Sequence, residues 1–395
     1  MKTIGTISRG IKAPIIKKGD DLVNIVVDSV LAACEEGKFE LQDRDVVAMT
    51  EAIVGRAQGN YATLEQIAKD VKTKTGGKTV GLIFPIMSRN RFSMILKAIA
   101  MGVEKLIIQL SYPSDEVGNP LIPMDIIYDK GINPNSDVFD EKKYYETFGK
   151  ILHPFTGLDY IELYKSYASE FCECEIILAN DPKAILSYTD VVINADIHTR
   201  NRTKATLKEA GASKVFNLAD FMTESVDGSG FNPQYGLYGS NLATDDSIKL
   251  FPKDGQALVD SIAALFKQKT GKNVEVMIYG DGAFKDPVGG IWELADPVVS
   301  PAYTKGLEGT PNELKLKYLA DNAIGDLQGE EAKKAMQDLI KAKQDNLVAN
   351  MASQGTTPRR LTDLLGSLCD LTSGSGDKGT PIILVQNYFN NYAND

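Results

Sequence analysis

The chain has 395 residues, of which 43% are hydrophobic and 24% are charged, and its formal net charge is −10 at pH 7. This length accommodates two or three domains with a large core, and the composition is typical of a globular protein. The negative net charge argues against duplex nucleic acid and anionic membranes as bulk partners, because both are bound through a basic face.

Signals for export and for cysteine or histidine chemistry are weak. The N-terminal stretch MKTIGTISRGIKAPIIKKGDD lacks the apolar core of a signal peptide. No run approaches the roughly 18 apolar residues of a membrane span, so we expect a cytoplasmic protein without membrane contact. The four cysteines lack CxxC spacing and are expected to be free thiols. Two histidines, His153 and His198, give poor support to a His-rich metal site or a Ser-His-Asp triad.

The first zone, residues 1–84, alternates helix and strand. An Asp-Asp pair at 20–21 can cap a helix that ends at Gly37. Residues 44–60, RDVVAMTEAIVGRAQGN, predict a buried strand followed by a polar turn punctuated by glycine. A second short strand is predicted over 78–84.

The middle zone, residues 85–225, alternates apolar strands with amphipathic helices. Helices are predicted over 92–102, 160–171 and 202–213, and strands over 104–110, 174–181, 188–198 and 214–218. Near-continuous apolar strands between helices predict a parallel sheet covered on both faces. Two strand ends carry the polar groups Asn180–Asp181 and Asp196–Ile197–His198. These residues either cap the following helix or contact a ligand, and both interpretations stay open.

The third zone, residues 226–395, begins where the stretch TESVDGSGFNPQYG interrupts the periodicity. A helix is predicted over 255–271 and a strand over 273–279, followed by the loop GDGAFKDPVGG. A long polar helix is expected from about 329 to 350. The last helix is expected to begin at Thr357–Pro358, with proline at its first position, and a β-branched strand closes the zone.

Four loops carry candidate chemical groups. Asp281 lies between two glycines at a strand end, where it would suit Mg²⁺ or Mn²⁺, although Asp-Gly is also a common turn pair. Residues 373–379, SGSGDKG, either bind phosphate through backbone N–H groups or form a flexible turn. Ser240–Asn241 and Glu51 with Arg56 are further polar candidates.

Four blocks of sequence, taken together, resemble a known family. The blocks are GIKAPIIKKGDDL, LQDRDVVAMTEAIVGRAQGN, GSNLATDDSIKLFPKDG with the following LFKQKTGKNVEVMIYGDG, and TDLLGSLCDLTSGSGDKGTPIILVQ. In this order they are similar to segments of the coenzyme F420-0:L-glutamate ligase family. The resemblance covers roughly the first 65 residues and much of 235–395, whereas 85–225 has no counterpart in it.

The resemblance implies a mixed fold of the α+β and α/β kinds. The N-terminal part, 1–84, and the C-terminal part, 226–395, would form one catalytic unit, and 85–225 would be an inserted parallel α/β domain. By analogy with the family we also expect a homodimer.

The activity that the resemblance implies is an amide ligation driven by GTP or ATP and supported by Mg²⁺ or Mn²⁺. L-Glutamate would be joined to a carboxylate of a small cofactor-like acceptor, through an acyl phosphate. The resemblance assigns metal binding to Asp281, and Asp377 is a second metal candidate. The nucleotide-binding candidates are Ala13, Pro14, Ile15, Ile16, Glu51, Arg56, Asn241, Gly374, Ser375, Gly376 and Lys378.

The sequence departs from the family pattern at three metal-site positions. Tyr238, Gly282 and Gly374 stand where the family has oxygen ligands, and Asp245, Asp246, Asp286 or Asp377 would have to substitute for them. An inactive nucleotide- or metabolite-binding protein is therefore an alternative, and so is a ligase acting on a folate-type acceptor. An NAD-type oxidoreductase is disfavoured because no G-x-G-x-x-G follows a strand.

Overall fold

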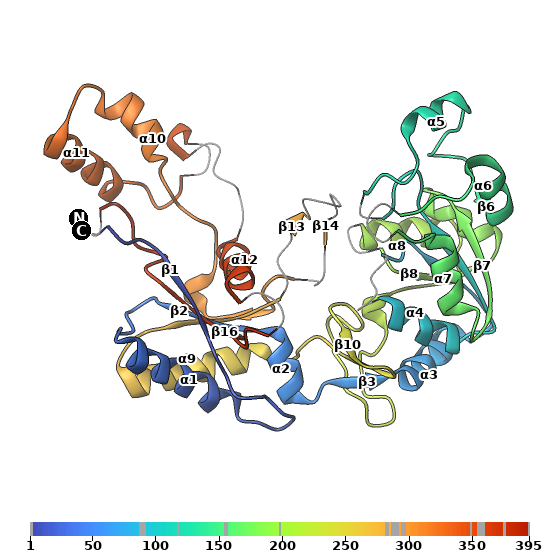
Figure 1. Cartoon of the computed structure of the whole chain (residues 1–395), viewed down its shortest axis with the longest axis horizontal. Helices are drawn as coiled ribbons and strands as arrows, with labels where there is room; N and C mark the ends of the chain where they lie inside the picture. The colour runs from blue at the N-terminus through green and yellow to red at the C-terminus, as the bar shows by residue number, and fades with distance from the viewer. Residues whose placement is uncertain are drawn as a thin grey trace. The chain divides into compact units, whose positions relative to one another are not determined.

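The computed structural model describes most of the chain, and its contacts divide the chain into two units (Figure 1). The first unit comprises Met1–Val54, Asp254–Gly282 and Val298–Asp395, and the second comprises Gly55–Lys253 and Ala283–Pro297. The described residues are 3–86, 92–116, 118–153, 157–196, 199–280, 284–285, 292–293, 298–347, 350–353, 360–373 and 377–393.

A five-stranded sheet forms the centre of the first unit and joins both ends of the chain. Strands from near the N-terminus and near the C-terminus are neighbours, and only β2 and β12 run parallel. In spatial order the strands are β1 (Ile7–Ile11), β16 (Ile382–Gln386), β2 (Val46–Thr50), β12 (Glu275–Tyr279) and β15 (Ala302–Tyr303).

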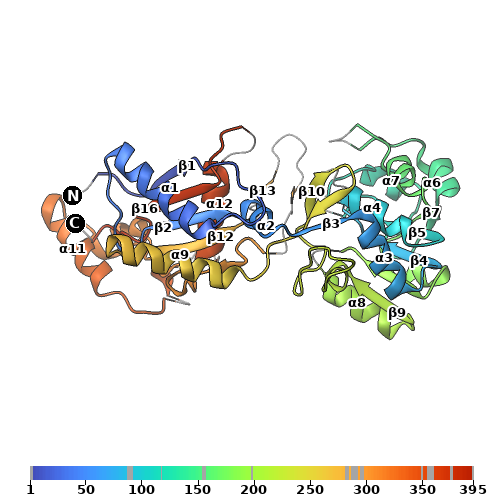
Figure 2. The same cartoon turned by 90° about the horizontal axis from the view of Figure 1, so that it is seen from below.

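Helices cover both faces of this sheet (Figures 1 and 2). α1 (Leu22–Gly37) and α9 (Gly255–Thr270) lie on one face, and α12 (Leu361–Ser373) lies on the other. α1 begins where the Asp21 carboxylate accepts the N–H of Asn24, as the sequence predicts. A smaller core is shared by α10 (Leu316–Leu319) and α11 (Gly329–Lys341).

The second unit contains a six-stranded sheet in which only β6 is antiparallel to its neighbour. The first of the parallel strands in the sequence, β4, lies inside the sheet, and later strands are added outward on both sides. In spatial order the strands are β6 (Phe139–Asp140), β7 (Glu173–Leu178), β5 (Lys105–Leu110), β4 (Thr79–Ile83), β8 (Val191–Asn194) and β9 (Lys214–Asn217). The winding therefore reverses between β4 and β8, as in doubly wound α/β sheets.

The strands of this sheet carry apolar side chains on both faces, and helices cover each face. One core includes side chains from α3 (Leu64–Thr75), α4 (Phe92–Met101) and α7 (Tyr160–Ala168), and the opposite core includes α8 (Arg200–Glu209) and the short helix η1 (Pro182–Ser187). The remaining elements of the unit are β3 (Tyr61–Thr63), α5 (Met124–Asp129), α6 (Glu141–Phe148), the short helix η2 (Leu218–Asp220), β10 (Asn241–Thr244), β11 (Ser247–Lys249), β13 (Phe284–Lys285) and β14 (Trp292–Glu293).

The mixed α/β fold predicted from the sequence is confirmed, and the parallel strands predicted for the middle zone are present. The second unit begins after residue 54 and its main segment ends at residue 253. The limits predicted for the inserted domain, at 84/85 and 225/226, both lie inside this segment. The strand predicted over 78–84 is β4, and it pairs within the second unit's sheet because β5 and β8 flank it. In the described part of the chain, no helix has the length and apolar character needed to cross a bilayer.

Two local predictions are corrected. The polar turn predicted after β2 is a helix, α2 (Glu51–Gln58), and Gly55 within it lies close to a neighbouring segment: a Cβ there would be 3.2 Å from the Leu250 carbonyl oxygen. Gly55 therefore permits close packing and does not form a turn. The helix expected over 329–350 ends at Lys341, whereas the helix start predicted at Thr357–Pro358 lies outside the described residues.

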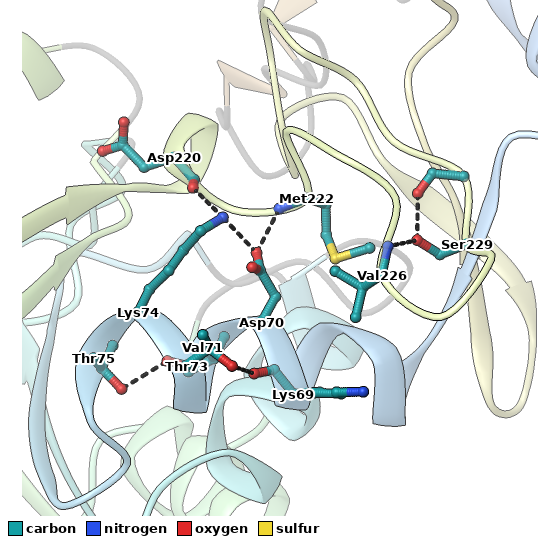
Figure 3. A network of polar contacts seen from close by, with 11 residues as sticks. Lys69, Asp70, Val71, Thr73, Lys74, Thr75, Asp220, Met222, Val226 and Ser229 are labelled. Carbon is teal, nitrogen blue, oxygen red and sulfur yellow. Dashed lines mark hydrogen bonds and ion pairs between the residues drawn. The ribbon is translucent and has the colours of Figure 1, made fainter.

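A buried carboxylate fastens α3 to a loop within the second unit (Figure 3). Asp70 is buried and accepts hydrogen bonds from Lys74 Nζ at 2.8 Å and from the Met222 N–H at 2.7 Å. Lys74 also donates to the Asp220 carbonyl oxygen at 2.8 Å. The backbone of Met222 is in the left-handed region, with a φ of 52°. The hydrogen bond from its N–H to Asp70 helps to hold the chain in this conformation.

We expect Asp70→Ala to lower the free energy of unfolding by about 2 kcal/mol, because the buried Met222 N–H and the partly buried Lys74 ammonium both lose their acceptor. Urea unfolding of the full chain, with hydrogen exchange of the Met222 amide, measures the effect. The matched control is Lys69→Ala, whose ion pair with Asp227 is exposed and should contribute less than about 0.5 kcal/mol. Equal effects of the two substitutions would contradict the prediction.

Candidate functional site

Four strand ends of the first unit meet at one edge of its sheet. The register pairs Ile11 at the end of β1 with Ile382 at the start of β16, and Ile382 with Met49 near the end of β2. The next residue of β2, Thr50, pairs with Tyr279 at the end of β12, and its N–H donates to the Pro381 carbonyl oxygen at 3.0 Å. The loops that follow β1, β2 and β12 therefore leave this edge beside the loop that precedes β16.

Several of the predicted nucleotide-binding residues lie on these loops. Residues 13–16 follow β1, and within them Ile15 is 79% exposed whereas Ile16 is buried. Glu51 is the first residue of α2, directly after β2; it is buried, and its carboxylate accepts a hydrogen bond from the Thr50 hydroxyl at 2.9 Å. The sheet register brings these two sequence blocks, far apart in the chain, to the same edge.

The loop before β16 reaches this edge from the other end of the chain. Asp377 and Lys378 are exposed there. Thr380 packs closely on β1: a Cβ built on Gly10 would lie 3.0 Å from the Thr380 Cβ, and the Thr380 hydroxyl donates to the Ser373 carbonyl oxygen at 3.1 Å. A glycine at position 10 therefore lets the loop lie against β1.

The remaining predicted residues of these loops lie outside the described part of the chain. They are Gly374, Ser375, Gly376, Asp281, Gly282 and Asp286. The residue before Asp281 is described: the Gly280 N–H donates to the Val299 carbonyl oxygen at 2.8 Å, directly after β12. Asp281 is the next residue in the chain after Gly280.

The sequence interpretation missed Tyr279, the last residue of β12. Its side chain belongs to the core beneath α12, and its hydroxyl is buried without a hydrogen-bond partner of normal geometry among the described residues. Burial raises the pKa of Tyr279, and a side-chain contact with Ser373 offsets this effect only in part, so the hydroxyl stays protonated. Tyr279 therefore lies beside Ser373, the last residue of α12. The sequence feature that could have identified Tyr279 is its position immediately before Gly280–Asp281.

We expect Tyr279→Phe to change the thermal stability little, because the buried hydroxyl makes no hydrogen bond of normal geometry and its contact with the Ser373 side chain is weak. If the hydroxyl serves a ligand at this edge, the nucleotide kcat/KM should fall about tenfold. Thermal unfolding and steady-state kinetics measure the two effects. The contrasting variant is Tyr164→Phe, whose buried hydroxyl donates to the Pro85 carbonyl oxygen at 2.7 Å; its loss should cost about 1 kcal/mol. A clear loss of stability in Tyr279→Phe would contradict this interpretation.

Arg56 and Asn241 belong to the second unit. Arg56 is five residues beyond Glu51 on α2, about 140° further around the helix axis, so the two side chains do not share a face. Asn241 begins β10, where it pairs with Lys249 of β11, and its Oδ1 accepts the N–H of Leu242 at 2.9 Å. Both residues therefore remain predictions as nucleotide ligands.

Tyr238, which stands where the resembling family has a metal-binding Asp, is a core residue of the second unit. It is buried, its hydroxyl donates to the Asp196 carbonyl oxygen at 3.2 Å, and the Arg200 guanidinium lies 5.1 Å from its ring centroid. Burial raises its pKa. A protonated, bonded phenol does not replace a carboxylate as a metal ligand.

The polar strand ends of the middle zone cap helices and loops. Asp181 accepts the N–H of Lys183 at the start of η1, and Asp196 accepts the N–H of Thr199 before α8, both at 3.0 Å. The Asn180 side chain accepts from the Tyr112 N–H and donates to the Tyr112 carbonyl oxygen. Of the two interpretations left open, the structure supports capping for these residues; Ile197–His198 lie outside the described residues.

The described residues do not assemble a metal centre by themselves. Among them, no group of three or more His, Cys, Asp or Glu side chains is arranged to hold a metal ion. Asp377 is exposed, and Asp245 and Asp246 lie in the turn between β10 and β11, where the Thr244 hydroxyl donates to Asp246 at 2.6 Å. The fit of a metal therefore depends on Asp281, outside this part of the chain.

A family model described as F420-0:Gamma-glutamyl ligase matches residues 10–387. The chain belongs to this family. The predicted resemblance is confirmed, and the family match runs through both units, including the middle zone for which the sequence interpretation found no counterpart.

Two curated members of similar sequence are named coenzyme F420:L-glutamate ligase. The protein from Methanosarcina acetivorans is 38% identical over 85 residues, which cover 20% of this chain and 30% of that protein. The protein from Methanothermobacter thermautotrophicus is 34% identical over 68 residues, covering 16% of this chain and 25% of that protein. The chain thus matches less than a third of the length of each of these F420-0:gamma-glutamyl ligase relatives.

Proposed function

We propose that this protein is an amide ligase that uses GTP or ATP and a divalent cation to add L-glutamate to a carboxylate of a small cofactor-like acid. The observation that carries the proposal is the family match over residues 10–387. It is supported by the sheet edge of the first unit, where the segment at 13–16 follows β1, Glu51 follows β2 and residues 377–380 precede β16.

The chemistry of such a ligation fits the residue types present. The acceptor carboxylate attacks the terminal phosphorus of the nucleotide, which forms an acyl phosphate and releases the nucleoside diphosphate. The glutamate amine then attacks the acyl carbon, phosphate leaves, and the amine loses a proton. Neither step needs a nucleophilic cysteine or a histidine base; both need hydrogen-bond donors and positive charge around the phosphoryl oxygens. Lys378 and the backbone N–H groups of its loop would supply these.

A divalent cation is proposed on the resemblance, with Asp281 as its ligand and Asp377 as a second candidate. When bound, it would neutralise phosphoryl charge. Because the described residues do not gather a ligand set, we assign the roles of binding and orienting the nucleotide to the chain's own loops at the sheet edge.

The test is an assay of phosphate release. The full chain is incubated with GTP or ATP, Mg²⁺ or Mn²⁺, L-glutamate and a panel of acceptor acids that includes the deazaflavin coenzyme precursor and folate. We expect phosphate release that depends on both glutamate and one acceptor, with the amide product identified by mass spectrometry. Nucleotide hydrolysis that is independent of both would overturn the proposal. Phosphate release that depends on folate as the acceptor would identify the protein as a ligase acting on a folate-type acid.

A second candidate function is nucleotide or metabolite binding without catalysis. The observation that favours it is Tyr238, which is buried and hydrogen-bonded where the family has a carboxylate. In that case calorimetry would detect tight nucleotide binding, and no acceptor of the panel would give phosphate release.

A further inference from the structure

The hydroxyl of Thr50 makes two hydrogen bonds at the point where β2 passes into α2. It donates to the Glu51 carboxylate at 2.9 Å and accepts the Ala52 N–H at 3.4 Å. The second bond is the usual contact of a helix-capping residue, but it is long. The first bond is the shorter one, and capping does not require it, because a cap uses the hydroxyl only as an acceptor.

The backbone of Thr50 is fixed by its neighbours in the first unit. Its N–H donates to the Pro381 carbonyl oxygen at 3.0 Å, and it is the register partner of Tyr279 at the end of β12. Thr50 is half-buried, and Glu51 is buried with an exposed fraction of 5%. Because the χ1 angle of a β-branched side chain is also restricted, the Thr50 hydroxyl holds the carboxylate in a defined orientation.

Thr50 lies on the face of the sheet that α12 covers. Val46 and Ala48 of β2 belong to the core that includes residues of α12, and so does Tyr279. Side chains alternate between the two faces along a strand, so Thr50, two residues after Ala48, lies on the same face as these residues. The bond from Thr50 to Glu51 is therefore at the end of this core, where the loops leave the sheet edge.

The chemistry of a carboxylate limits what Glu51 can bind in a nucleotide. An ionised carboxylate accepts hydrogen bonds and has none to donate, and the phosphoryl oxygens of a nucleotide are acceptors as well. The groups of a nucleotide that can donate are the ribose hydroxyls and the N–H groups of the base. A buried acceptor selects for such a donor, because leaving it without one costs free energy of desolvation.

We propose that Thr50 is a positioning residue for nucleotide binding: its hydroxyl holds the Glu51 carboxylate where it accepts a hydrogen bond from the nucleoside part of the nucleotide. This inference rests on the proposed function, which places the nucleotide at the sheet edge of the first unit. Thr50 acts through Glu51 and does not itself contact the ligand.

The test is calorimetry on the full chain with GTP and with ATP in the presence of Mg²⁺. Thr50→Val keeps the shape of the side chain and removes the hydroxyl, and we expect it to weaken nucleotide binding about tenfold. Thr50→Ser restores the donor and should bind within about threefold of the unsubstituted protein. Thermal unfolding verifies that each variant is folded at the temperature of the titration.

A double substitution tests whether Thr50 acts through Glu51. Glu51→Gln should weaken nucleotide binding at least about tenfold, and Thr50→Val combined with Glu51→Gln should bind no more weakly than Glu51→Gln alone. Titration with the 2′-deoxynucleotide identifies the donor. Glu51→Gln should change the affinity for this analogue little if the ribose 2′-hydroxyl is the donor, and about tenfold if the donor is elsewhere in the nucleoside.

The matched control is Thr63→Val. Thr63 caps α3 in the second unit, where its hydroxyl oxygen accepts the Gln66 N–H at 3.2 Å. Its substitution should lower the thermal stability through loss of the cap and leave nucleotide affinity unchanged. Unchanged affinity in Thr50→Val would overturn the proposal, and so would losses by Thr50→Val and Glu51→Gln that multiply in the double variant.

Phosphate release measured on the same variants separates this inference from the proposed function. If Thr50→Val weakens nucleotide binding while no acceptor gives phosphate release, the ligase function is wrong and the role of Thr50 stands. Ligation by the unsubstituted protein, with unchanged nucleotide affinity in Thr50→Val, would overturn only the role of Thr50. Absence of nucleotide binding by the unsubstituted protein would overturn both.

Discussion

Replacement of Asp281 by asparagine is expected to reduce glutamate- and acceptor-dependent phosphate release by at least about 100-fold. The substitution keeps the size of the side chain and removes the negative charge that a divalent cation requires. Because Asp281 follows Gly280 at the end of β12, the residue lies next in the chain to the sheet edge that we assign to the nucleotide. Steady-state phosphate release at several Mg²⁺ and Mn²⁺ concentrations measures the effect.

The control for this experiment is Asp338→Asn. Asp338 is an exposed aspartate on α11, and its substitution should change activity less than about twofold. Circular dichroism and thermal unfolding should be the same for both variants. If Asp281→Asn retains full metal-dependent activity, the assignment of the metal to this residue is wrong, although the family membership of the chain would stand.

Replacement of Gly236 by alanine is expected to destabilise the protein by at least about 3 kcal/mol. Gly236 has a φ of +56°, and an alanine Cβ there would lie 2.4 Å from the Phe221 carbonyl oxygen and 2.7 Å from that of Ala219. Both are backbone atoms, so the loop that carries Met222 would have to move as well. Left-handed strain and the steric clash act together at this position.

Gly228→Ala is the matched comparison for this effect. Gly228 has a φ of +80° in the same unit, but nothing lies within 4 Å of the position that a Cβ would occupy. Its substitution should therefore cost only the backbone strain, about 1 kcal/mol. Urea unfolding of both variants separates the steric part from the conformational part. Similar losses in the two variants would contradict the steric explanation.

The regular elements of the middle zone were predictable from the sequence because each follows a simple apolar pattern. The strand predicted over 104–110 is β5, Lys105–Leu110, in which five of six residues are buried. The helix predicted over 92–102 is α4, Phe92–Met101. Burial on both faces of a parallel sheet produces an unbroken apolar run, which local sequence records directly.

The helix α2 was not predictable in the same way. Gly55 and the polar residues around it indicated a turn, yet this glycine lies against the carbonyl oxygen of Leu250. The requirement for a small residue came from a segment far along the chain. A pattern read over neighbouring residues cannot distinguish a glycine needed for a turn from one needed for close packing.

The candidate site was predicted only as a set of separate loops. The blocks around 13–16, 51 and 377–378 were identified from residue types and from the family resemblance, but the sheet register that brings them to one edge is a tertiary property. The burial of the Tyr279 hydroxyl could not be read from the sequence, because burial is defined by the residues that surround a side chain.

By itself, the sequence determined the α/β character of this protein and its family, because both are recorded in local apolar periodicity and in ordered motifs. Only the tertiary structure decided that β1 and β16, from opposite ends of the chain, are neighbours, and that 78–84 is an inner strand of the second unit. The physical reason is that strand pairing depends on backbone hydrogen bonds, which every residue except proline can form and which therefore leave little trace in side-chain identity.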